Sequence, residues 1–219
     1  STASKWWAFT QMQLAHSKLS RASGCSFYKL MGTGKNKGFD PRPDFSTYAL
    51  LQVWDNESSA RSFIDHSALL KAYRFRSKRH FTLYMKNIKS HGAWSGRNPF
   101  EASGGHKRDA PIAVITRATI KWSKMRAFWS YVPHSEEGIH TNPGLLYTKG
   151  IGEWPIRQMA TFSLWQNEKA MRDFAYKEDG HLGAIQKTRE LNWYSEELFS
   201  RFRLLDITGN WQIQGLQIN

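Results

Sequence analysis

Residues 54–63 read WDNESSARSF, and residues 165–174 read WQNEKAMRDF. Tryptophan, asparagine, glutamate, arginine and phenylalanine recur at one constant offset, so five of ten positions are identical. Unrelated residues match at roughly one position in twenty. The chain therefore contains an internal repeat, which predicts how the rest of the sequence is organised.

Shorter matches extend the repeat in the same order, at slightly different offsets. Together they indicate two copies of a unit of about a hundred residues. Glycine and charge replace the hydrophobic pattern near residues 104–108, so we predict two units, residues 1–103 and 108–219. The matches are Ser4, Lys5, Ala8 and Phe9 with Ser123, Lys124, Ala127 and Phe128; Gly32 and Gly34 with Gly150 and Gly152; and Phe81 and Leu83 with Phe202 and Leu204.

The second copy has the pattern of a complete β-α-β-β-α-β unit. Strands are predicted over 112–120, 145–149, 158–165 and 197–205, with a helix over 123–131 that stops at Pro133 and another capped by Asn167. This order is that of the ferredoxin-like unit, whose antiparallel sheet carries both helices on one face. Two such units predict an α+β fold, a tandem duplication that resembles the dimeric α+β barrel.

The first copy lacks a counterpart of the 112–120 strand. Because Ser4 aligns with Ser123, that counterpart would lie before Ser1. We therefore expect the first ferredoxin-like repeat to be missing its N-terminal strand, and to leave an unpaired sheet edge.

The chain is basic, with 31 Lys and Arg against 18 Asp and Glu and a net charge of +13. This charge favours an anionic partner, such as an acidic protein or anionic lipid. No nucleic-acid-binding motif occurs, and we expect no nucleic acid partner. The densest basic cluster, residues 71–80, is interpreted as a solvent-facing helix end.

The sequence contains no run of about eighteen apolar residues, and we expect neither a membrane span nor a secretory leader. The single cysteine, Cys25, excludes an internal disulfide and any Cys-x-x-Cys metal site. We expect a cytoplasmic protein. Peripheral membrane contact and a homo-oligomer are both compatible with this sequence.

The glycines of FYKLMGTGKNKGF, residues 27–39, invite comparison with phosphate-binding loops. Their spacing matches neither a Walker A loop nor a dinucleotide loop. Since YTKGIG at 147–152 repeats the Gly-x-Gly without the lysines, we interpret both as a duplicated turn. Lys35 and Lys37 are then expected to form a basic lip at a pocket or partner site.

Few residues suggest chemistry on their own. Carboxylate pairs at 136–137, 178–179 and 196–197 lie in hydrophilic sequence and are interpreted as caps or surface charge, and no histidines have zinc-site spacing. His181 differs, because the small residues after it leave room for a flat cofactor. One imidazole beside an apolar pocket suffices to hold haem, although a lone histidine is more often a surface residue.

Six segments resemble the spheroidene monooxygenase family, and the resemblance extends over nearly the whole chain. They are FYKLMGTG at 27–34, GFDPRP at 38–43, TRATI at 116–120, GIGE at 150–153, ATFSLW at 160–165 and WYSEELFSRF at 193–202. The resemblance implies a haem b enzyme that uses O2 and electrons from a ferredoxin. Its implied substrate is an acyclic carotenoid, which gains a keto group near the chain end.

Carried over to this chain, the resemblance assigns the haem iron to His181. His66 occupies the matching place in the first copy, but the smaller residues Gly183 and Ala184 favour His181. Arg117 and Gln158, in family-like strand segments, are the candidate catalytic groups.

Three functions stay open from the sequence. The first is a haem-dependent monooxygenase that acts on a long apolar substrate and accepts electrons from ferredoxin or a similar acidic donor. The second is a haem-dependent dehydratase or peroxidase-like enzyme of the same barrel, which would need a general acid above the iron. The third is a non-catalytic barrel that binds a hydrophobic ligand.

Overall fold

The protein is represented by a computed structural model, which describes residues 2–35, 40, 42–105, 109–135, 142–177 and 190–216. Its helices are α1 (Thr2–Leu14), α2 (His16–Leu19), α3 (Glu57–His66), α4 (Ala68–Arg76), the 3-10 helix η1 (Trp122–Lys124), α5 (Met125–Ser135) and α6 (Glu168–Lys177). Its strands are β1 (Cys25–Gly34), β2 (Pro43–Trp54), β3 (Phe81–Gly92), β4 (Ile112–Ile120), β5 (Leu145–Trp154), β6 (Gln158–Trp165) and β7 (Tyr194–Gly209).

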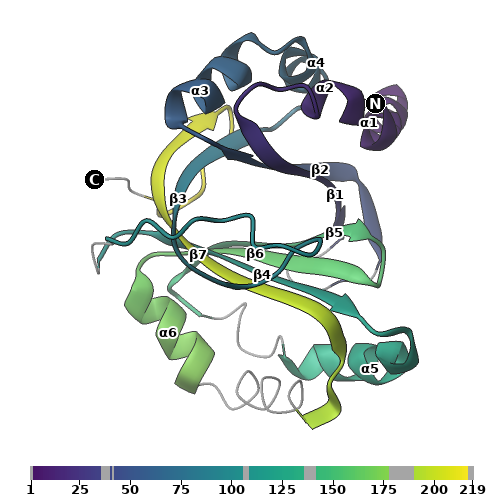
Figure 1. Ribbon diagram of the computed structural model, residues 1–219, viewed down its shortest axis with the longest axis vertical. Helices are drawn as coiled ribbons and strands as arrows, with labels where there is room; N and C mark the ends of the chain where they lie inside the picture. Colours follow the sequence, from purple (N-terminus) through teal and green to yellow (C-terminus); the bar gives the residue numbers. More distant parts are fainter. Residues whose placement is uncertain are drawn as a thin grey trace.

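The fold is α+β, with strands of both halves in one seven-stranded antiparallel sheet. The strand order is β2-β1-β5-β6-β4-β7-β3. Figure 1 shows the sheet curled around an interior, with α1 to α4 outside the first half and α5 and α6 outside the second. The boundary predicted at 104–108 falls partly outside the described residues, so the division into two units stays a prediction.

The second half confirms the predicted order β-α-β-β-α-β. Its strands lie in the order β5-β6-β4-β7, and β4 and β6 begin and end where the sequence indicates. The prediction that the first helix stops at Pro133 was wrong, because α5 continues to Ser135. A proline in a helix loses its own N–H bond and its ring crowds the carbonyl group four residues earlier. Only two residues follow Pro133 in α5, so this disturbance lies at the helix end.

The repeated motif builds the same strand-to-helix junction twice. Asn56 caps α3, its Oδ1 accepting a hydrogen bond from the Ser59 amide at 2.8 Å. Asn167 does the same for α6, accepting from the Ala170 amide at 2.9 Å. An asparagine cap satisfies an N–H group that the helix cannot, which is why both helices begin at this point.

The aromatic residues of the motif also recur in their contacts. The ring centroids of Trp54 and Phe63 lie 5.1 Å apart, and those of Trp165 and Phe174 lie 5.2 Å apart. Each pair fixes a helix against the strand that precedes it. The glutamate and arginine of the motif form an ion pair within each helix, at 2.7 Å in α3 and 2.8 Å in α6.

The Gly-x-Gly sequences are not turns, which corrects the sequence interpretation. Gly32 lies in β1 and Gly152 in β5, and the two strands pair there through Gly32↔Gly152 and Thr33↔Ile151. Among the described residues, this short ladder is one of two strand pairings that join the halves. The other, between β3 and β7, is long and runs from Phe81↔Gly209 to Gly92↔Leu198.

Candidate active site

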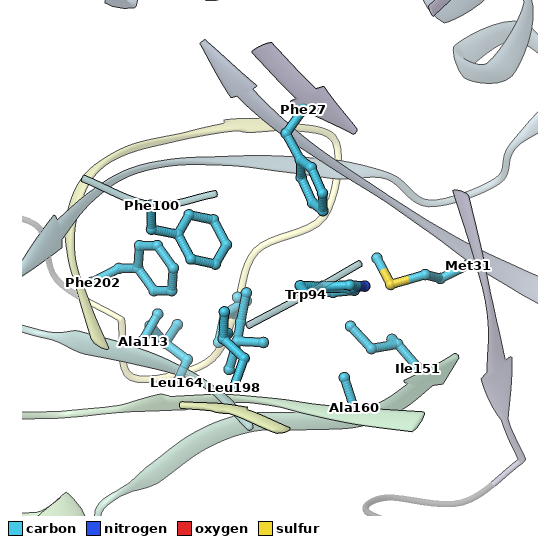
Figure 2. Close-up of a cluster of buried hydrophobic side chains, with 12 residues drawn as sticks. Phe27, Met31, Trp94, Phe100, Ala113, Ile151, Ala160, Leu164, Leu198 and Phe202 are labelled. Carbon is cyan, nitrogen blue, oxygen red and sulfur yellow. The ribbon is translucent and has the colours of Figure 1, made fainter. Parts of the chain in front are cut away.

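The interior of the curled sheet is an apolar core that takes residues from both halves. Figure 2 shows Trp94 lying flat at its centre, near Phe27, with Phe100 and Phe202 to one side. The Trp94 and Phe27 rings meet at 69° with centroids 5.8 Å apart, and Phe100 and Phe202 meet edge to face at 4.9 Å. Trp94 is 1% exposed, so a loop beyond β3 supplies a central core residue.

A large cavity opens beside this core. Its volume is about 2230 Å³, against the 300–1,000 Å³ typical of small-molecule sites. Two wall hydroxyls, Tyr48 Oη and Thr148 Oγ1, have no hydrogen-bond partner within the described residues. A long apolar molecule with a small polar group would suit such a wall. The apolar lining from the interior includes Met31, Leu51, Leu83, Tyr147, Ile151 and Phe162.

Charged side chains gather in the interior next to this cavity. Arg117 pairs with Glu196 and lies 4.0 Å from a Glu153 oxygen, and Lys29 Nζ donates to Glu153 Oε2 at 2.5 Å. Trp94 Nε1 donates to Glu153 Oε1 at 2.6 Å. We call Lys29, Arg117, Glu153 and Glu196 the inner charge cluster.

The inner charge cluster lies next to the cavity, and none of its four members is on the cavity wall. Inward-facing residues alternate along a strand, so the wall residues Ile115 and Ile151 are the inward neighbours of Arg117 and Glu153. The cluster holds two cations and two carboxylates, and its formal charge is zero. Each charge therefore has a partner of opposite sign, which offsets part of the cost of removing it from water.

The environment of Glu196 keeps it ionised. Burial raises the pKa of Glu196. Hydrogen bonds from the Gly96 and Ser95 amides and the attraction of Arg117 lower the pKa by more than burial raises it, so the pKa lies below its ordinary value. Gly96 and Ser95 both have positive φ angles, of 81° and 59°. In this turn, both backbone N–H groups point toward the Glu196 carboxylate and donate hydrogen bonds to it.

The two candidate catalytic residues face the same interior but do not touch the cavity. Arg117 is 2% exposed, and Gln158 lies diagonally from it across the β4–β6 ladder, where Thr119 pairs with Gln158 and Arg117 with Ala160. Neither lines the cavity within the part of the chain that the structure describes. Their catalytic roles stay predictions.

The candidate histidine ligands of haem are not among the described residues of the cavity wall. His181, the predicted haem ligand, lies outside the described residues. His66 ends α3 on the exposed surface, with Nδ1 2.9 Å from the Ser62 carbonyl oxygen, and it is not on the cavity wall. Among the described histidines, His80 is on that wall. The described residues contain no group of three or more His, Cys, Asp or Glu that could hold a metal ion.

Sequence reasoning missed most of the inner charge cluster. The Glu196–Glu197 pair was assigned to caps or the surface, and for Glu196 this was wrong, because it shares the inward face of β7 with Leu198. Strand alternation from Leu198 back to Glu196 was the signal that could have identified it. The carboxylate pairs at 136–137 and 178–179 lie outside the described residues.

The basic cluster of residues 71–80 is also more than a helix end. Helix α4 ends at Arg76, and the residues after it reach the opening of the cavity. Cationic side chains therefore surround one rim of the cavity. The members that line it are Arg74, Arg76, Lys78, Arg79 and His80.

Among the described residues, no helix is both long and apolar enough to cross a membrane.

Comparison with known proteins identifies relatives along almost the full chain. A spheroidene monooxygenase of Rhodobacter capsulatus is 36% identical over 212 residues, which covers 96% of this chain and 88% of that protein. One of Cereibacter sphaeroides is 32% identical over 94% of this chain and 64% of that protein, and one of Rubrivivax gelatinosus is 29% identical over 96% and 80%. No protein-family model matches the chain.

Solved structures show only distant likeness. A protein from Fusobacterium nucleatum is 10% identical with a TM-score of 0.43, covering 100% of this chain and 92% of that one. SnoaB, a cofactor-independent oxygenase from Streptomyces nogalater, is 14% identical with a TM-score of 0.34, covering 48% of this chain and 97% of that one.

Proposed function

The chain belongs to the spheroidene monooxygenase family and is an oxidoreductase of the monooxygenase class, and we propose that it is a haem-dependent enzyme that oxidises a long apolar substrate, an acyclic carotenoid. It would take oxygen from O2 and electrons from ferredoxin or a similar acidic donor. Among the three functions that the sequence left open, the relatives support the monooxygenase.

The observation that carries the substrate class is the cavity. Its wall on the interior side of the sheet is apolar and includes Met31, Tyr147, Ile151 and Phe162, as a long hydrocarbon chain requires. A substrate would enter past α4, whose residues Tyr73, Arg74 and Arg76 are on the cavity wall. The hydroxyls of Tyr48 and Thr148 would bind the polar group of such a substrate.

Haem b is the proposed cofactor, and the cavity meets one of its requirements, an apolar wall on the interior side. His181 would hold the iron, as the family resemblance implies. Among the described histidines, His66 is unsuitable because it is exposed and does not line the cavity. A bound haem supplies the iron at which O2 is activated.

The proposed reaction balances with two electrons per oxygen atom inserted. One atom of O2 enters a C–H bond as a hydroxyl group, and the other leaves as water with two electrons and two protons from the donor and solvent. A second turnover at the same carbon gives a geminal diol, which loses water to form the ketone.

The basic residues at the cavity rim, Arg74, Arg76, Lys78 and Arg79, would attract an acidic electron donor, because opposite charges speed the encounter between two proteins. Lys35, which is exposed, lies in the segment that the sequence marks as a basic lip. We expect Lys35→Glu with Lys37→Glu to slow reduction by ferredoxin about tenfold at low salt. The haem absorption spectrum should not change, and an unchanged reduction rate would leave this segment without a role in donor binding.

A turnover assay tests the proposed function. The chain is reconstituted with haem and given spheroidene in detergent, reduced ferredoxin and ¹⁸O2. We expect a keto carotenoid that carries ¹⁸O, detected by mass spectrometry. Binding of the carotenoid with no labelled product under any donor would instead support a non-catalytic barrel.

His181→Ala and His66→Ala form a matched pair for the cofactor. We expect His181→Ala to lose the Soret band and turnover, and His66→Ala to keep both. A His181→Ala variant with an unchanged spectrum would contradict the assignment of the ligand without contradicting the reaction.

A further inference from the structure

The sheet is open between its two edge strands, β2 and β3. Every neighbouring pair in the order β2-β1-β5-β6-β4-β7-β3 is antiparallel, so β2 and β3 run in the same direction. In the second half, β6 and β7 also run in the same direction, and β4 lies between them, antiparallel to both. Within the described residues, the first half has no strand in the matching place.

The large cavity passes through this opening. Its wall includes Leu51 and Leu83, which pack in the interior, and also Leu50 and Tyr84, which pack under the helices. A single cavity reaches both faces of a sheet only where the sheet is interrupted. We call this place the β2–β3 gap.

In the second half, β4 fills the equivalent place with apolar residues on both faces. Ala113 and Ile115 face the interior core, whereas Ile112 and Val114 pack under α6. All four residues are 6% exposed or less. A strand that fills the β2–β3 gap would have to be apolar on both faces too.

Helix α1 exposes a side chain that its counterpart buries. Phe9 aligns with Phe128, which is 6% exposed and packs against Ile120, the last residue of β4. Phe9 is 50% exposed, and its neighbour Trp6 is 65% exposed. Phe9 lies against Phe45 near the start of β2, where the end of a β4-like strand would also lie.

We propose that the β2–β3 gap receives one β-strand, antiparallel to both neighbours, apolar on both faces and about nine residues long like β4. The occupant is an extended segment of the same polypeptide that leads into α1. In the second half, β4 leads through Lys121 and η1 into α5. This assignment does not depend on the proposed function.

The position of α1 supports that occupant over a separate chain. A strand equivalent to β4 would end beside the first residues of β2, since β4 ends opposite Gln158 at the start of β6. Helix α1 lies at that end of β2, because Phe9 meets Phe45 with ring centroids 6.2 Å apart. A strand that ended there would continue directly into α1.

The test supplies the strand from the chain itself. A copy of residues 112–121, IAVITRATIK, is fused in front of residue 2, and hydrogen exchange of the β2 and β3 amides is compared with and without it. We expect exchange in both strands to slow at least about tenfold. The matched control carries Val114→Asp and Ile115→Asp in the added copy only, and should give no protection.

A thiol measurement makes the test independent of exchange rates. In a Cys25→Ser background, the extension should slow labelling of Phe9→Cys but not of Leu14→Cys, which is 61% exposed at the end of α1. Unchanged exchange in β2 and β3, or equal protection by the control extension, would overturn the proposal. A dimer formed by the extended chain would show that a second copy supplies the strand, and would overturn the assigned occupant.

Discussion

Arg117 is the residue on which the inner charge cluster depends. It is 2% exposed and is the one member that lies near both carboxylates. Arg117→Met would leave Lys29, which is half-buried, as the one cation of the cluster beside Glu153 and Glu196. We expect the free energy of unfolding to fall by about 3 kcal/mol, as is typical when a buried ion pair loses one partner. Urea unfolding followed by tryptophan fluorescence measures this change.

Two further variants separate charge from packing at this position. Arg117→Lys keeps the charge but loses the forked guanidinium, so it should recover only part of the lost stability. Arg61→Met removes a half-buried arginine that also contacts two carboxylates, Glu57 and Asp206, and its cost should be much smaller because its side chain is more exposed than that of Arg117. Equal losses of unfolding free energy for Arg117→Met and Arg61→Met would show that the inner charge cluster stabilises the fold no more than the ion pairs of Arg61 do.

Glu196 gives the cluster a pH dependence of known sign. Because its pKa is lower in the folded chain than the ordinary value of 4.5, its contribution to stability is present above pH 4.5 and is lost as the pH falls through the folded value. We expect the difference in unfolding free energy between the unmodified chain and Glu196→Gln to be largest at pH 7 and to shrink below pH 4.5. Urea titrations at pH 7, 5, 4 and 3 measure it, with Glu197→Gln at the exposed neighbouring position as control. A difference that stays constant with pH would rule out this role for Glu196.

The β1–β5 junction offers two glycines in contrasting surroundings. A Cβ atom at Gly152 would lie 2.8 Å from the Gln158 carbonyl oxygen, whereas one at Gly32 would meet nothing within 4 Å. Gly152→Ala should therefore cost about 1–3 kcal/mol of unfolding free energy by overpacking. Gly32→Ala should be neutral or stabilising by up to about 1 kcal/mol, because alanine restricts the unfolded chain. Thermal unfolding of both variants tests the contrast. A similar loss of unfolding free energy in the two would mean that neither position tolerates a side chain.

The secondary structure of the second half was predictable because its determinants are local. The repeated motif carries its own cap in Asn167, its own ion pair and its own aromatic contact, all within ten residues. The Gly-x-Gly sequences were misread for the opposite reason. Gly32 pairs with Gly152 in the other half of the chain, and no local pattern distinguishes a turn glycine from one in a strand that meets another strand closely.

The site was less predictable than the fold because four strands and a loop build it together. Arg117 was selected from its family-like segment, but its partners Glu153 and Glu196 come from β5 and β7. Trp94, which binds Glu153, follows β3 in a segment with no repeat and no motif. Such a cluster can be recognised only when the pairing register of the strands is known, since each member alone resembles a surface charge.

The interior core joins the two halves so closely that they should unfold together. Phe100 of the first half meets Phe202 of the second, and the β3–β7 ladder runs the length of both strands. We expect one unfolding transition in urea, with the same midpoint by circular dichroism and tryptophan fluorescence. Phe100→Ala, at a position 8% exposed, should lower the free energy of unfolding by about 3–5 kcal/mol and still leave one transition. Two separated transitions, with only the first moved by Phe100→Ala, would mean that residues 1–103 and 108–219 are independent domains rather than two halves of one sheet.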